Sequence, residues 1–370
     1  MIYRRLLLLL SCAVFASACC AQTSLKEARK RAEVGVAALQ QWYVPRTGLY
    51  RTTGWWNSAN AITTITDYMR VTGKKKKYTG VLKNTFAQAQ IAVPKEQATV
   101  EGKEMTGFLG FLNKYYDDEG WWALAWIDAY DLTHDAKYLA LARSIFEDMA
   151  RGWDETCSGG IWWSKDRKYK NAIANELFLS VAAHLANRLK DAKYGEWTAK
   201  EWAWFKGSGM INEENVINDG LRIDATTGAC ANNGKTVWTY NQGVVLGGLA
   251  EWSKAGHADA IAEAKRIADG ALSKLTDANG VLHDKCEPKC GADGLQFKGI
   301  FVRNLRTLND VAPEERYARA FAVNADSIWT KNRTSEDTFG TVWSGPLTTP
   351  DAGTQSSALD ALVAAIPQKK

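Results

Sequence analysis

The sequence predicts an all-α fold, an (α/α)6 barrel in a single domain. Helical patterns recur from Leu25 almost to the end of the chain, and short segments with Gly, Pro, Asp or Asn separate them, whereas strand signals are sparse. Some of these helices are amphipathic and others are apolar or small nearly all round. This difference is typical of an outer ring of helices packed around an inner one. Twelve helices in two rings make an (α/α)6 barrel.

We expect twelve helices of ordinary length. In chain order they span 25–43, 57–72, 80–91, 119–132, 135–151, 171–190, 194–206, 241–255, 258–275, 297–310, 313–330 and 354–366. In 135–151 and 258–275 the apolar side chains fall on one face, which we expect to be buried. Segments 121–127 and 243–250 are apolar or small on all sides, so we expect neighbours all round them.

The helices belong to one domain, covering residues 22–370. No Pro- or Ser-rich linker divides the chain, and helical pairs continue through its midpoint. A helical solenoid is the other architecture that this many helices could build. It would show a sequence repeat of fixed period, which this chain lacks.

The first 21 residues have the pattern of a secretory signal peptide. Arg4-Arg5 precede the apolar run Leu6–Leu10, and small residues follow up to Ala21. We therefore expect a secreted, periplasmic or cell-surface protein, with a lipidated Cys19 or Cys20 as the alternative. No later segment approaches the roughly twenty apolar residues of a membrane span, so no span is expected.

Removal of residues 1–21 would leave four cysteines in a compartment where disulfides persist. Cys286 and Cys290 lie in a loop with Gly and Pro, and we expect a disulfide between them. The pairing of Cys157 and Cys230 stays open. A zinc site would need ligands that four scattered histidines do not provide, so we expect no metal and no cofactor.

The charge and the motifs exclude several function classes. A net charge of +5 over 370 residues is not that of a nucleic-acid-binding protein, and the run Lys74–Lys77 fits a solvated turn. The chain has no HExxH pattern, no Walker A loop, no GxSxG elbow and no dinucleotide fingerprint after a strand. Carboxylates remain as the reactive groups.

The segment Tyr115–Trp122 places three consecutive carboxylates between two aromatic pairs, just before a helix. Flat aromatic faces can hold a pyranose ring, and carboxylates transfer protons and stabilise charge, so this combination fits a sugar site. A structural explanation competes with it. Asp118 could cap the helix that runs from Glu119, with Asp117 and Glu119 favoured by the helix dipole.

Further polar and aromatic clusters lie in connections or at helix starts, where the mouth of a barrel is built. Beside the aspartates, the candidates for substrate contact are Trp55, Asn57, Asp67, Tyr116, Trp121, Trp122, Trp163, Asn175, Glu176, Tyr240, Asn241, Gln242, Gln296 and Lys298. Structural alternatives exist: Trp pairs can seal the barrel, Asn241 can cap a helix and Asn175 can be a satisfied amide. Together the candidates supply the aromatic platforms, amides and carboxylates of a sugar-binding groove.

These motifs resemble glycoside hydrolase family 76, the α-1,6-mannanases, from about residue 25 to 366. The matching segments follow the family's order: 115–118 with 120–126, 160–163, 170–177, 239–243, 296–301 and 354–358. The resemblance implies an (α/α)6 barrel that cleaves α-1,6-mannosidic bonds with retention, with Asp117 as the nucleophile and Asp118 as the acid/base. The partner that it implies is α-1,6-linked mannan or manno-oligosaccharides.

Retention requires two carboxyl groups roughly 5 Å apart, which neighbours on a bent loop can reach. The charge of Asp117 and the surrounding tryptophans would both raise the pKa of Asp118 and keep it protonated. We expect an endo-acting monomer.

Two alternatives to hydrolysis stay open. Transfer to a sugar hydroxyl, as in fungal relatives that act on cell-wall mannan anchors, differs from hydrolysis only in the attacking group. The second alternative is a non-catalytic mannan-binding protein, although binding alone would not need both aspartates. An enzyme for uronic acids would want grouped basic residues near these motifs, which the sequence lacks.

Overall fold

The computed structural model describes residues 23–92, 99–100, 103–104 and 106–367. The expected signal peptide at 1–21, with Cys19 and Cys20, lies outside these residues. Within them the chain forms twelve α-helices and three two-stranded antiparallel sheets. None of the described helices is both long and apolar enough to cross a membrane.

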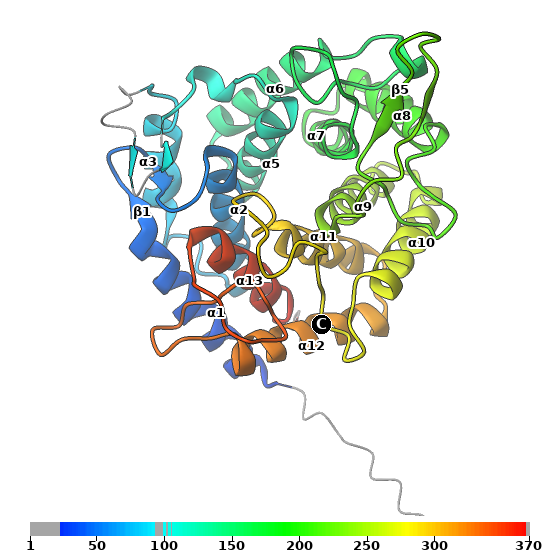
Figure 1. Ribbon diagram of the computed structural model, residues 1–370. Coiled ribbons are helices and arrows are strands. Elements are labelled where there is room, and N and C mark those ends of the chain that lie inside the picture. Colours follow the sequence, from blue (N-terminus) through cyan, green and yellow to red (C-terminus); the bar gives the residue numbers. More distant parts are fainter. Residues whose placement is uncertain (1–22, 93–98, 101–102, 105, 368–370) are drawn as a thin grey trace, which may run out of the picture.

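Six helices form a closed inner ring, in which each contacts the next and the last packs back on the first. They are α2 (Trp55–Thr72), α5 (Tyr116–Thr133), α7 (Ala172–Leu189), α9 (Thr239–Ser253), α11 (Phe297–Val311) and α13 (Ala352–Ala364). The outer helices are α1 (Leu25–Leu39), α3 (Thr79–Gln88), α6 (Ala136–Ala150), α8 (Ala192–Gly207), α10 (Asp259–Lys274) and α12 (Glu315–Lys331). The two rings are visible in Figure 1. The predicted (α/α)6 fold is confirmed.

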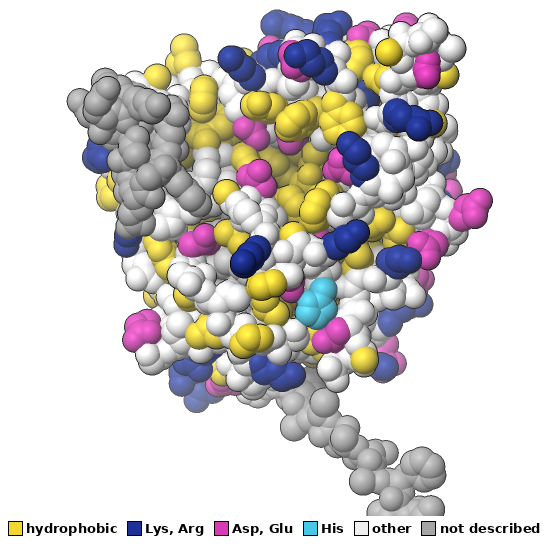
Figure 2. Space-filling model, in the orientation of Figure 1, with side chains coloured by type: hydrophobic (Ala, Val, Ile, Leu, Met, Phe, Trp, Pro, Cys, Tyr) yellow, Lys and Arg dark blue, Asp and Glu magenta, His cyan; other side chains and the backbone are white. Residues whose placement is uncertain are grey.

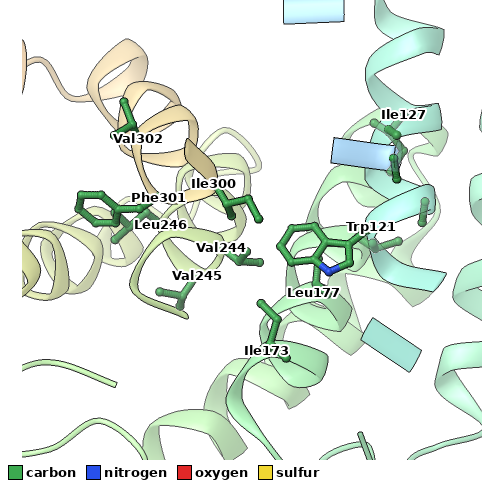
Figure 3. Packing of buried hydrophobic residues seen from close by; sticks show 14 of the residues in the cluster. Trp121, Ile127, Ile173, Leu177, Val244, Val245, Leu246, Ile300, Phe301 and Val302 are labelled. Carbon is green, nitrogen blue, oxygen red and sulfur yellow. The ribbon is translucent and has the colours of Figure 1, made fainter. Parts of the chain in front are cut away.

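Burial separates the two rings as the patterns predict. In α10 the buried residues form one stripe from Ala260 to Ala271, whereas in α9 nearly every residue from Thr239 to Trp252 is buried. Figure 3 shows Trp121, Leu177 and Val244, from three inner helices, packed in the interior. Small residues permit this packing: a Cβ added to Gly243 would lie 2.5 Å from the Cα of Phe301 on α11.

Helix starts differ from the predicted bounds in a way that matters for the site. Helix α2 begins at Trp55 because the side chain of Asn57 accepts a hydrogen bond from the Gly54 N–H, 3.0 Å away. Helix α5 begins at Tyr116, so its first turn includes both Asp117 and Asp118. The first helix is shorter than the predicted 25–43 and ends at Leu39.

The connections carry the remaining elements. The strands are β1 (Tyr43–Val44), β2 (Leu49–Tyr50), β3 (Thr99–Val100), β4 (Lys103–Glu104), β5 (Leu221–Ile223) and β6 (Cys230–Asn232), paired in that order. Short 3-10 helices lie at Gln40–Trp42, Leu109–Phe111 and Thr156–Ser158. Cys286 and Cys290 form a disulfide, and a second disulfide joins Cys157 to Cys230 on β6.

Candidate active site

A pocket of about 480 Å³ opens at the end of the barrel where the inner helices begin. Helices α2, α5, α7, α9 and α11 all contribute residues from their first turns or N-caps. The lining residues are Trp56, Tyr115, Asp117, Asp118, Trp121, Trp163, Tyr169, Asn171, Asp219, Tyr240, Asp293 and Phe297. Figure 2 shows a hollow on this face with hydrophobic and acidic side chains around it. Aromatic and carboxylate groups therefore meet in one place.

Neither aspartate caps α5, so the capping explanation is wrong. The N-cap is Tyr115, which makes no side-chain cap bond, and Asp117 and Asp118 are the second and third residues of the helix. Asn113 shapes this start: its Nδ2 donates to Asp118 Oδ2 at 2.6 Å, and its Oδ1 accepts from the Tyr115 N–H at 2.7 Å. Both carboxylates lie near the positive end of the helix dipole.

Asp117 has an unusual environment for a carboxyl group. Burial raises its pKa well above the ordinary value, and the neighbouring Asp118 raises it further. The indole N–H of Trp163 opposes this by donating to Asp117 Oδ2 at 3.0 Å, and backbone N–H groups at the helix start act in the same direction. Asp117 Oδ1 has no hydrogen-bond partner among the described residues.

Asp118 also has a raised pKa. Burial raises its pKa to about 7, the hydrogen bond from Asn113 lowers it, and the charge of Asp293 raises it. Since both aspartates have raised pKa values, adding a second negative charge to the pair is unfavourable. The pair can thus supply one carboxylate and one carboxylic acid.

One wall of the pocket is a row of parallel aromatic rings. Trp56 stacks on Trp121 with centroids 5.6 Å apart, and Trp121 stacks on Tyr240 at 6.4 Å. Tyr240 in turn stacks on Phe297 at 3.8 Å. The four rings come from α2, α5, α9 and α11. Such a wall gives the pocket an apolar surface that the C–H groups of sugar rings can contact.

Two further acids hold polar groups around the pocket. Asp293 Oδ1 accepts from the Trp56 indole N–H at 3.1 Å, and Asp219 Oδ2 accepts from the Tyr169 hydroxyl at 2.5 Å. Asn233 donates to the same hydroxyl at 2.8 Å. In the described part of the chain, no group of three or more His, Cys, Asp or Glu side chains could hold a metal ion.

Three of the fourteen candidates for substrate contact line this pocket: Trp121, Trp163 and Tyr240. The pocket is also lined by residues outside these candidates: Trp56, Tyr115, Tyr169, Asn171, Asp219, Asp293 and Phe297. Trp56, Tyr115 and Phe297 are immediate neighbours of candidates, so the motifs point to the right segments but not to the side chain that lines the pocket. Asp219 and Asp293 lie in loops without any flanking motif.

Several candidates have structural roles instead. Trp55 packs against Phe108 and Trp122 in the core, and its indole N–H donates to the Ala89 carbonyl at 3.4 Å. Trp122 is fully buried and Tyr116 nearly so. These side chains face away from the pocket because they occupy the other sides of the same helices.

The amide candidates are buried and bind the chain itself. Asn57 donates to Gln296 Oε1 at 2.8 Å, Asn175 pairs with both backbone groups of Ile161, and Gln242 does the same with Ile217. Lys298 donates to the Thr341 carbonyl at 2.8 Å and pairs with Glu287. Through these hydrogen bonds the side chains stabilise the positions of the loops beside the helix starts.

Asp67 lies in a different cavity, of about 50 Å³, where it pairs with Arg70 and neighbours Asp128 and His184. Glu176 and Asn241 are fully buried on α7 and α9 and have no side-chain hydrogen-bond partner among the described residues. Burial raises the pKa of Glu176 well above its ordinary value.

The chain matches a family model over residues 27–370, and that family is glycosyl hydrolase family 76. Its sequence is 28% identical over 289 residues to the mannan endo-1,6-alpha-mannosidase DCW1 of Eremothecium gossypii, covering 71% of this chain and 59% of that one. It is 29% identical over 242 residues to the mannan endo-1,6-alpha-mannosidase DFG5 of Saccharomyces cerevisiae, covering 60% and 49%. The match thus spans about half to three fifths of these relatives' length.

Two solved structures share the fold. The GH76A α-1,6-mannanase from Salegentibacter sp. HEL1_6 superposes with a TM-score of 0.79 at 23% identity, covering 91% of this chain and 98% of that one. Dfg5 from Chaetomium thermophilum, in complex with glucosamine, gives 0.79 at 22% identity, covering 93% and 91%. Because the family model covers nearly all of the sequence, the chain belongs to glycosyl hydrolase family 76.

Proposed function

We propose that this chain is an exported, monomeric glycoside hydrolase that cleaves α-1,6-mannosidic linkages within mannan and retains the anomeric configuration. The observation that carries the proposal is the pair Asp117 and Asp118 at the start of α5, in a pocket with a wall of stacked aromatic rings. A retaining glycosidase needs two carboxyl groups beside the scissile bond, one charged and one protonated. The neighbouring Asp118 contributes to the raised pKa of Asp117, so the pair resists carrying two negative charges at once.

Relatives supply the substrate class. The curated relatives are named as mannan endo-1,6-alpha-mannosidases. A variant of the Salegentibacter mannanase in which two consecutive aspartates are replaced by asparagine is described as inactive, and it holds α-1,6-mannotriose. The present sequence has one pair of consecutive aspartates, Asp117-Asp118.

We assign Asp117 as the nucleophile because the family resemblance implies this role, and Asp117 accepts N–H hydrogen bonds that lower its pKa against the effect of burial. Its carboxylate attacks the anomeric carbon and forms a glycosyl ester, while Asp118 gives its proton to the departing glycosidic oxygen. Asp118, now charged, then takes a proton from water, and the resulting hydroxide displaces Asp117 from the anomeric carbon. The two inversions retain the configuration, and both carboxyl groups return to their starting states.

The pocket favours a neutral sugar substrate. Trp121 and Tyr240 belong to the apolar wall of the pocket, and Trp163 lies beside Asp117 and donates its indole N–H to the carboxylate. Transfer to a sugar hydroxyl is the alternative outcome, because the second step requires only an acceptor that Asp118 can deprotonate.

Product analysis on linear α-1,6-mannan tests the proposal. We expect oligosaccharides of mixed length early in the reaction, which indicates internal cleavage, and α-anomers in the first NMR spectra, which indicate retention. An added manno-oligosaccharide acceptor measures transfer in the same experiment. No cleavage of α-1,6-mannan, or β-anomeric first products, would contradict the proposal. A β-linked mannan is the negative control.

A further inference from the structure

Lys170 is a fully buried cation next to the site, and the mechanism above does not use it. It lies just before Asn171, the N-cap of α7, and its side chain has no exposed surface. Its Nζ lies 2.6 Å from the Thr156 carbonyl oxygen, 2.8 Å from that of Gly159 and 3.0 Å from that of Gly160. Two oxygens of Asp154 complete the set, Oδ1 at 2.9 Å and the carbonyl at 3.3 Å.

This arrangement surrounds an ammonium group as oxygen ligands surround a metal ion. The ammonium has three N–H donors but five oxygens lie within reach, so the acceptors outnumber the protons. Carbonyl oxygens gathered this closely repel each other unless a positive charge lies between them. The Trp162 ring, 4.8 Å from Nζ, adds a cation–π contact. A buried charge is tolerated only with such compensation.

The backbone around Nζ adopts a conformation that is uncommon for L-amino acids. Cys157, Ser158, Gly159 and Gly160 have φ values of 59°, 62°, 134° and 82°, four consecutive residues in the positive-φ region. Positive φ values are uncommon in residues other than glycine. They occur where contacts with the surrounding structure stabilise them. Here this run places the carbonyls of Gly159 and Gly160 on the Lys170 ammonium.

The same segment positions Trp163 against Asp117. Trp162 donates its indole N–H to Asp154 Oδ2 at 2.7 Å, which ties the segment to the acid that Lys170 binds. Trp163 follows directly, with its carbonyl accepting from the Tyr116 N–H at 3.0 Å and its N–H donating to the Tyr169 carbonyl at 2.8 Å. Its indole then reaches Asp117 Oδ2.

We propose that Lys170 is a positioning residue: its ammonium occupies a cation site formed by residues 154–160 and thereby holds Trp163 in place against Asp117. The disulfide between Cys157 and Cys230 constrains the same loop but makes no bond to Gly159 or Gly160. A test by turnover rests on the proposed function, whereas a test by the indole N–H resonance of Trp163 does not.

The first test is Lys170→Met, which removes the ammonium group but keeps an unbranched chain of four heavy atoms. In protein labelled at tryptophan, the indole N–H resonance of Trp163 is assigned by its loss in Trp163→Phe. In the wild type we expect this resonance to move with the titration of Asp117, and in Lys170→Met we expect it to lose that response. Lys168→Met is the matched control, because Lys168 is two residues away and its side chain is 80% exposed.

The kinetic expectation follows from the same geometry. Loss of the Trp163 hydrogen bond raises the pKa of Asp117, so the acidic limb of the pH–kcat profile should move to higher pH in Lys170→Met and in Trp163→Phe alike. Turnover should fall by about 10- to 100-fold, with KM less affected. The other titratable groups that line the pocket with Asp117 are Asp118, Asp219, Asp293, Tyr115, Tyr169 and Tyr240, and they are unchanged in both variants.

A second test asks whether the site accepts a free cation. Lys170→Ala leaves space for propylammonium, which restores the three missing carbons and the charge. We expect propylammonium chloride, present during folding, to recover the melting temperature, the Trp163 resonance and the activity. Propan-1-ol and sodium chloride at equal concentration should recover none of them.

These outcomes decide the proposal even if Lys170→Met fails to fold. Recovery by propylammonium and not by propan-1-ol supports the cation site, and no recovery overturns it. The proposal is also overturned if folded Lys170→Met shows the Trp163 resonance and the pH profile of the wild type. This holds even when the melting temperature falls. If the wild type does not cleave mannan, the proposed function fails, and the resonance of Trp163 still tests Lys170.

Discussion

Asp117 and Asp118 are adjacent in sequence but differ in their hydrogen-bond partners. Asp117 receives the indole N–H of Trp163, while Asp118 receives the side-chain amide of Asn113 and faces Asp293. Burial raises the pKa of both. Because each carboxyl group accepts one side-chain N–H and both pKa values are raised, single substitutions are the way to test the two proposed roles.

Asp117→Asn should abolish turnover while the fold and mannan binding survive. The amide has nearly the same volume as the carboxylate but cannot form the glycosyl ester, so kcat should fall by more than about 10³-fold. The measurement is the initial rate on α-1,6-mannan, with the dissociation constant for mannan and the melting temperature as controls. Turnover like that of the wild type would falsify the mechanism.

Asp118→Asn should impair cleavage in a way that depends on the leaving group. Loss of general acid catalysis should slow cleavage of mannan by about 10²- to 10⁴-fold. The leaving group of an activated aryl mannoside needs little protonation. The rate of the ester-forming step should therefore fall far less on this substrate. Comparing single-turnover rates on both substrates checks this. If Asp117→Asn, rather than Asp118→Asn, slowed mannan cleavage much more than aryl mannoside cleavage, the two roles would be exchanged.

The raised pKa of Asp118 also predicts how stability varies with pH. The folded state holds this proton up to about pH 7, whereas the unfolded chain releases it near 3.8. Between these values the folded state binds more protons, so the free energy of unfolding should fall as pH rises from about 4 to 7.

Asp118→Asn removes this titration. Allowing for water in the open pocket, we expect the variant to be more stable than the wild type at pH 7 by about 1–3 kcal/mol, with little difference at pH 4. Denaturant unfolding at both pH values measures it. An equal effect at the two pH values would contradict the proton-linked explanation.

At the scale of elements, the loops between helices hold the site as much as the helix starts do. Gly160 has a φ of 82°, and a Cβ there would lie 2.3 Å from the Trp204 ring of α8. Both its conformation and the space around it exclude a side chain. This position therefore requires glycine, which adopts a positive φ without a steric penalty.

Gly160→Ala should accordingly destabilise the protein by about 3 kcal/mol and reduce activity through displacement of Trp163. Gly195→Ala is the matched control, because Gly195 lies within α8 and a Cβ there would meet nothing within 4 Å. It should stabilise by about 0.5–1 kcal/mol. Denaturant unfolding of both variants checks the pair, and a neutral Gly160→Ala would show that the loop adapts freely.

At the scale of the whole molecule, two disulfides constrain the chain over different distances. The bond between Cys157 and Cys230 closes a segment with a sequence separation of 73, while that between Cys286 and Cys290 has a separation of 4. Because the entropy lost by the unfolded chain grows with loop length, the first should stabilise the fold more.

Replacing Cys157 and Cys230 together with serine should lower the free energy of unfolding by about 4 kcal/mol, against about 2 kcal/mol for Cys286 and Cys290. Chemical denaturation of the two double variants under non-reducing conditions measures the difference. Equal losses would mean that native contacts, rather than loop closure, set the contribution of these bonds.

For the residues that the structure describes, the sequence alone predicted the number and order of the helices and the (α/α)6 architecture, and it singled out the aspartate pair that lines the pocket. Helix periodicity is a local property, so twelve patterns were enough to predict two rings. The aspartate pair stood out because three adjacent carboxylates lie between aromatic pairs, and the other motifs and the family resemblance favoured a sugar site over a helix cap.

Only the tertiary structure decided which side chains face the pocket. Successive residues on a helix point about 100° apart, so Trp56 lines the pocket while Trp55 enters the core, and Phe297 lines it while Gln296 binds Asn57. Which of two neighbours turns inward depends on how each helix is rotated against the next helix in the ring. Asp219 and Asp293 reach the site through loops whose paths are set by long-range packing. Local sequence patterns do not predict these paths.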